Sequence, residues 1–117
     1  MTDPRASGAA GAAGSLDEGP VQSAMTAGVL ELRLVIRQAQ SLKDKRRVVR
    51  SLQDRLRSRF DVAVAEVDLQ DDRQQAVLGV AVVGNDEAVL GSVLHKVVDF
   101  VRRNPDAVLC DFHIEMR

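Results

Sequence analysis

The sequence has no tryptophan or tyrosine and only three phenylalanines among its 117 residues. The core must therefore be built from aliphatic side chains, and a surface that stacks nucleic-acid bases on aromatic rings is not expected. The single cysteine, Cys110, cannot form a disulfide within the chain and is predicted to be a buried small residue. Such sparse cysteine usage fits a reducing, cytoplasmic compartment.

Long apolar segments are also missing. No run of 18 or more apolar residues exists, and the N-terminus lacks a basic stretch followed by an apolar one. We therefore expect neither a membrane span nor a secretory signal. With 45% apolar and 28% charged residues, the composition is that of a globular domain, and 117 residues fit a single core.

The first part of the chain differs in composition from the rest. Residues 1–26 are rich in Ala, Gly and Ser and show no hydrophobic period, which predicts a disordered tail. Residues 27–117 are predicted to form the folded domain. Met25 stands directly before the first periodic segment and is an alternative start of the chain.

Hydrophobic periodicity predicts six elements in the remaining sequence. Alternation of apolar and polar residues predicts strands over residues 29–36, 61–69, 75–83 and 108–116. Apolar residues at helical spacing predict one helix from a cap at Ser41 to about Arg59, and a second from Asn85 or Asp86 to Asn104. The order is β-α-β-β-α-β.

This order predicts an α+β, ferredoxin-like fold. We expect a four-stranded antiparallel sheet with strand order 4-1-3-2 and both helices on one face. On the last strand, alternation predicts that Cys110 and Phe112 point inward while Asp111 and His113 point outward. The other face of the sheet is left exposed or free for a partner.

Three segments carry a resemblance to a known family: SLKDKRRVVRSLQDRLR, VAEVD and LGVAVVGND. In combination they resemble the YlxP-like family, small bacterial proteins of domain of unknown function 503, from Val29 to the C-terminus. The resemblance implies a ferredoxin-like fold and no established activity. Genes of this family often lie among translation genes, which implies a role near RNA or the ribosome. Relatives often place a histidine and an aromatic residue around the hairpin loop, where this chain has Leu69 and Asp72, so no site is carried over there.

The first helix is strongly basic. Between Lys43 and Arg59 there are eight basic residues and two acidic ones. Five of the basic residues lie opposite the apolar stripe and form the candidate RNA- or phosphate-binding set: Lys43, Arg46, Arg47, Arg50 and Arg57. The others, Lys45, Arg55 and Arg59, are expected to flank the core and extend their charges to solvent. A row of cations suits phosphates, without predicted DNA specificity, but also suits a solvated face or an acidic protein partner.

The exposed sheet face supports a second hypothesis. Outward positions on the two central strands are Glu31, Arg33 and a set of small aliphatic residues on the third strand, with no aromatic side chain. RNA binding would therefore use the first helix. The small aliphatic positions could instead face a second sheet in a homodimer or another protein partner.

The enzymatic alternative depends on acidic residues. Glu66 and Asp68 are predicted to share one face of a strand, where they could hold a hard cation such as Mg²⁺. No nucleophile with a neighbouring base, zinc spacing or phosphate-binding glycine loop is recognised. His95 and His113 are predicted to be surface residues. We therefore expect no catalytic residue, metal or cofactor, and favour a non-enzymatic accessory protein that binds RNA or the ribosome.

Overall fold

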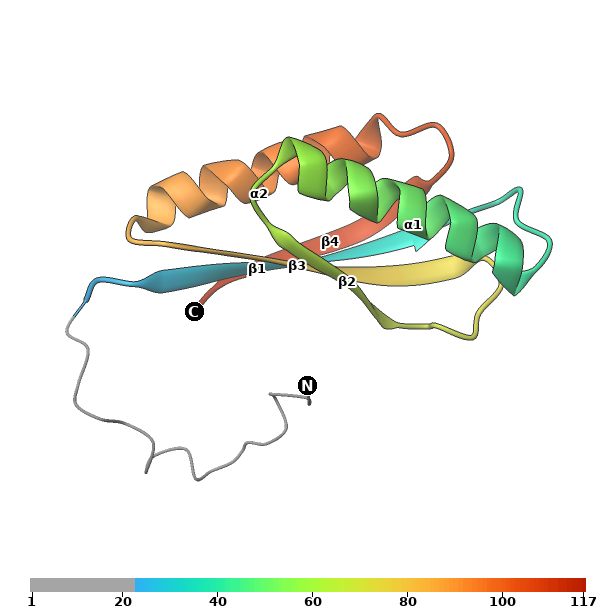
Figure 1. Cartoon of the computed structure of the whole chain (residues 1–117), viewed down its shortest axis with the longest axis horizontal. Helices are drawn as coiled ribbons and strands as arrows, with labels where there is room; N and C mark the ends of the chain where they lie inside the picture. The colour runs from blue at the N-terminus through green and yellow to red at the C-terminus, as the bar shows by residue number, and fades with distance from the viewer. Residues whose placement is uncertain (1–22) are drawn as a thin grey trace, which may run out of the picture.

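The structure is a computed structural model that describes residues 23–117. Its six elements follow in the order β1 (Thr26–Val35), α1 (Leu42–Arg59), β2 (Ala63–Asp68), β3 (Gln75–Gly84), α2 (Glu87–Arg102) and β4 (Val108–Met116) (Figure 1). Of the predicted tail, residues 1–26, residues 1–22 lie outside the described part of the chain. Neither helix is both long and apolar enough to cross a membrane.

The four strands form one antiparallel sheet in the order β2-β3-β1-β4. Each helix connects two strands that run parallel with one other strand between them, which is the ferredoxin-like arrangement. Figure 1 shows α1 and α2 on the same face of this sheet. The predicted fold class and strand order are confirmed.

The core lies between the sheet and the two helices and is aliphatic at its centre. In β1 every second residue is buried, namely Leu30, Leu32 and Leu34, and β3 pairs Leu78 and Val80 beside them. The helices add Val49, Leu52 and Leu56 from α1 and Leu94, Val97, Val98 and Val101 from α2. The three phenylalanines are only partly buried at its margin. Burial of aliphatic surface is the main stabilising contribution here.

Both helices begin at a side-chain cap. The Ser41 hydroxyl accepts a hydrogen bond from the backbone N–H of Asp44 at 3.1 Å, and the Asp44 carboxylate accepts from the Gln40 N–H at 3.1 Å. In α2, the Asp86 carboxylate accepts from the N–H of Ala88 at 2.9 Å. These caps satisfy N–H groups that lack a partner within the helix and define where each helix starts.

A β-bulge in β4 overturns the predicted orientation of Cys110. Arg33 of β1 pairs with Asp111 and the next residue, Leu34, pairs with Leu109, so Cys110 is an extra residue without a partner. Leu109 takes the inward position, and Cys110 is exposed. The prediction was wrong because one inserted residue shifts the alternation of faces.

A second bulge in β2 separates the two acidic residues of the predicted cation site. Glu66 pairs with Leu78 and Asp68 pairs with Val77, which leaves Val67 as the extra residue. Leu78 points into the core, so Glu66 points toward the helices and Asp68 points to the opposite face. The prediction that they share a face was wrong. Within residues 23–117 no group of three or more His, Cys, Asp or Glu side chains is placed to hold a metal ion.

Candidate functional site

Four of the five predicted phosphate-binding residues lie together on α1. Lys43, Arg46, Arg47 and Arg50 are exposed on the side of the helix away from the sheet, and they line one shallow depression. We call these four residues the α1 ridge. Because an α-helix rises 1.5 Å per residue, the ridge extends over about 10 Å.

Only one residue of the α1 ridge forms an ion pair among the described residues, and that pair is weak. Arg47 lies 3.8 Å from the carboxylate of Asp44, and both side chains are exposed. An exposed pair on neighbouring turns of a helix contributes little to stability. In the described part of the chain, Lys43, Arg46 and Arg50 form no salt bridge. The ridge can therefore bind an external anion without first breaking a strong internal ion pair.

Arg57 is placed differently from the other four predicted residues. Its Nη2 donates a hydrogen bond to the backbone carbonyl of Val64 in β2 at 2.8 Å, and its Nη1 donates to the Asp54 carboxylate at 3.4 Å. These contacts tie the C-terminal half of α1 to an edge strand. Arg57 therefore has a structural contact of its own and does not extend the α1 ridge.

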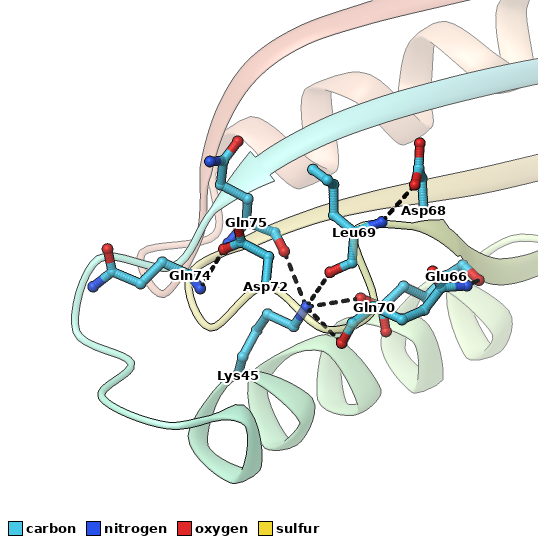
Figure 2. Close-up of polar contacts among 8 residues, drawn as sticks. All are labelled: Lys45, Glu66, Asp68, Leu69, Gln70, Asp72, Gln74 and Gln75. Atoms are coloured by element: carbon cyan, nitrogen blue, oxygen red, sulfur yellow. Dashed lines mark hydrogen bonds and ion pairs between the residues drawn. The ribbon is translucent and has the colours of Figure 1, made fainter.

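Lys45 is a buried cation that the sequence interpretation missed. Its side chain is 0% exposed, and its Nζ donates hydrogen bonds to the backbone carbonyls of Leu69 at 2.8 Å, Gln75 at 3.0 Å and Gln70 at 3.4 Å (Figure 2). The expectation that its charge would reach solvent was wrong. The signal was its helical position, four residues before the buried Val49.

Glu66 supplies the counter-charge. Its Oε2 lies 3.1 Å from the Lys45 Nζ, and the Glu66 side chain is 16% exposed. The ammonium has three protons and three carbonyls accept them, so the carboxylate is held by charge rather than by a hydrogen bond of its own. Removing one partner of such a pair would leave an uncompensated charge beside the core.

The loop between β2 and β3 is shaped around this ion pair. Leu69 has a φ of 59°, in the left-handed region, and its N–H donates to the Asp68 carboxylate at 2.8 Å. The Asp72 carboxylate accepts from the backbone N–H of Gln74 at 2.9 Å and of Gln75 at 2.7 Å (Figure 2). These two hydrogen bonds to its charged form lower the pKa of Asp72. The loop is thereby held with its carbonyls toward the ammonium.

Both histidines lie on the surface, as predicted. His95 is exposed on α2, where its Nδ1 lies 2.9 Å from the Gly91 carbonyl of the preceding turn. His113 is exposed on β4, with its Nε2 3.9 Å from the Glu115 carboxylate. Neither histidine is buried against another titratable side chain, since the His113–Glu115 pair is exposed.

Comparison with known proteins identifies the family. The family model described as "Protein of unknown function (DUF503)" matches residues 27–114. This chain belongs to the DUF503 family. A similar protein, "Uncharacterized protein YlxP" of Bacillus subtilis (strain 168), is 30% identical over 79 residues, which are 68% of this chain and 86% of that relative. The predicted YlxP-like membership is confirmed.

Two of the segments that resemble the DUF503 family meet at the buried ion pair. Lys45 lies in the SLKDKRR segment of α1, and Glu66 lies in the VAEVD segment of β2. The α1 ridge occupies the same stretch of α1 as Lys45 but faces the opposite way. The first segment therefore has two roles in this DUF503 chain: one side fixes the β2–β3 loop and the other presents cations.

Proposed function

We propose that this DUF503 protein binds structured RNA, with the ribosome as the first candidate, through the α1 ridge. The observation that carries the proposal is the exposure of four cations on one helix face with a single long internal ion pair. Guanidinium groups present paired donors that match phosphate oxygens. A row of cations along a phosphate backbone also gains affinity by releasing condensed counterions.

The distribution of charge supports contact on the helix side of the molecule. The formal net charge is only -1, so the positive charge of α1 is balanced elsewhere. On the opposite side, the outward sheet positions include Glu31, Asp68, Asp111 and Glu115, against Arg33 and Arg117, which pairs with Glu115 at 3.3 Å. A phosphate backbone is attracted to α1 and repelled from this acidic face.

The side chains of the two central strands favour the same orientation. The outward positions of β1 and β3 carry no aromatic ring, so the sheet has no platform on which bases could stack. The ridge itself also lacks aromatic side chains. Contact would therefore be made to the phosphate backbone, and affinity would depend steeply on salt and weakly on sequence.

Ribosome co-sedimentation from lysate tests the proposal. The wild-type protein is compared at low and moderately high salt with an Arg46→Ala, Arg47→Ala, Arg50→Ala triple variant. The matched control replaces three exposed cations at α2, Lys96, Arg102 and Arg103, and so has the same net charge. We expect salt-sensitive co-migration of wild type and control with a ribosomal subunit, and loss of co-migration in the α1 variant.

Binding to a purified RNA then gives the number of contacts. Losing three phosphate contacts should reduce the slope of log affinity against log salt by about 2 to 3. Wild-type protein that stays at the top of the gradient at low salt would exclude the ribosome as partner. Equal loss in the α2 control would mean that overall charge, and not the α1 ridge, determines binding.

A further inference from the structure

The outer face of the sheet, opposite the helices, carries an apolar hollow. No helix or strand of residues 23–117 covers this face (Figure 1). Two rows of outward residues cross it from β2 through β3 to β1: Ala63, Ala81 and Val29, and then Ala65, Gly79 and Glu31. Because four of these six residues are Ala or Gly, the surface is low there and its lining is mainly apolar. The hollow alone is smaller than the apolar patches that mark interaction sites, so an interface here has to use the whole face.

A third row beside the hollow carries a charge on each side of β3. It runs from Asp68 on β2 through Val77 on β3 to Arg33 on β1 and continues to Asp111 on β4. The Arg33 guanidinium donates a hydrogen bond to the Gln75 side chain at 3.2 Å. The opposite charges flank β3 at equal distance, one strand to either side. The negative charge of Asp68 on one side of β3 therefore complements the positive charge of Arg33 on the other side.

We propose that this face binds a second copy of the chain, with a two-fold axis parallel to β3. Rotation about that axis places β1 of one copy over β2 of the other. Arg33 then lies opposite Asp68 of the other copy, twice in each dimer. Val29 lies over Ala63 of the other copy, and the small side chain of the alanine leaves room for the valine. A two-fold interface requires this kind of self-complementary surface.

The residues on the axis permit the sheets to approach. β3 faces its own copy through Gly79 and Ala81. The exposed side chain of Val67 lies over Gly79, where an added Cβ would meet its Cγ1 at 2.9 Å, so Val67 and Ala81 make the apolar contact near the axis. Because the axis is parallel to β3, the two β3 strands run in the same direction, and stacked sheets pack about 10 Å apart. Glu31 is a charged residue inside this interface. Two side chains that can carry positive charge lie on the same face: His113, which pairs with Glu31 in register, and Arg117, which lines the same hollow.

The face is small for a dimer interface. With strands about 4.8 Å apart and a rise of about 3.3 Å per residue, three strands along β3 give a flat footprint of roughly 400 Å² per copy. Stable interfaces bury about 800 Å² of accessible surface per partner, so this face is about half the standard size and in the range of weak, transient contacts. We expect a dimer that dissociates in the micromolar range.

Sedimentation velocity over a concentration series from about 1 μM to 1 mM, which brackets that range, tests the dimer. The wild-type protein should pass from monomer to dimer. Ala81→Arg places two cations against each other on the axis and should weaken association by about tenfold or more. The α1 triple variant should dimerise like the wild type, which separates this proposal from the RNA-binding one. A wild-type monomer at every concentration, or a dimer that Ala81→Arg leaves intact, overturns the proposal.

A charge exchange tests the position of the axis. Arg33→Asp and Asp68→Arg should each weaken the dimer, since each creates two like-charge contacts, and the double variant should restore it. Asp68 also accepts a hydrogen bond from the Leu69 N–H, so thermal unfolding followed by circular dichroism must show that each variant is folded. Failure of the folded double variant to recover the wild-type dissociation constant would exclude this arrangement.

Discussion

Replacement of Lys45 by methionine is the sharpest test of the structure. Methionine fills a similar volume but removes the ammonium that binds the carbonyls of Leu69, Gln70 and Gln75 and faces Glu66. Breaking a buried ion pair by deleting one partner costs about 3–5 kcal/mol. Glu66 retains 16% exposure, so water can reach part of its carboxylate and we expect the lower end, about 3 kcal/mol.

A double-mutant cycle separates the ion pair from the carbonyl contacts. Glu66→Gln keeps the three carbonyl bonds and should cost less, about 1–2 kcal/mol. Lys45→Met combined with Glu66→Gln removes both charges, and should cost no more than Lys45→Met alone. The resulting coupling energy of about 1–2 kcal/mol measures the charge-charge contribution.

Urea unfolding followed by far-UV circular dichroism is the suitable assay, because the chain has no tryptophan or tyrosine for fluorescence. Hydrogen exchange provides a local measurement, and the amides of residues 69–75 should lose protection in Lys45→Met. Lys43→Met, on the exposed face of the same helix, serves as the control and should change stability by less than about 0.5 kcal/mol. A cost for Lys45→Met as small as that of the control would refute the buried ion pair.

Three further predictions concern other parts of the fold. Asp72→Asn should be less stable than wild type at pH 7. Because the pKa of Asp72 is lowered in the folded protein, this difference should begin to shrink as the pH falls below the ordinary value of 3.8 and should be lost once the pH is below the lowered pKa, which urea unfolding over a pH series would show. Cys110 should react with a thiol reagent in the native protein nearly as fast as in urea, whereas strong native protection would contradict the β4 bulge. Gly28→Val should cost about 1–3 kcal/mol in thermal unfolding, because an added Cβ would meet Leu94 Cδ1 at 2.9 Å; an unchanged melting temperature would count against this packing.

The fold could be predicted because its signals are local. The alternation in β1 and the helical spacing of Val49, Leu52 and Leu56 follow directly from which side chains must leave water. Once six elements were recognised in the order β-α-β-β-α-β, the handedness of crossovers left one sheet order. The exposed cations of α1 were found in the same way, since a helix has only one side opposite its buried stripe.

The two β-bulges could not be predicted in this way. Alternation along a strand specifies faces only while the register with the neighbouring strand is regular. At Val67 and Cys110 one residue has no partner, and the neighbours β3 and β1 determine that position. Which face of the sheet Asp68 and Cys110 point to therefore depends on the pairing with the neighbouring strand, and not on the sequence of β2 or β4 alone.

The sequence by itself determined the order of the elements, the buried faces of β1 and α1 and the cationic side of α1, because each depends on periodic burial within one segment. Tertiary structure alone decided that Lys45 is buried and Arg57 is tied to β2. The carbonyls that bind Lys45 come from residues 24 to 30 positions further along the chain. A lysine is excluded from a core unless such partners are present, and only the folded chain brings them together.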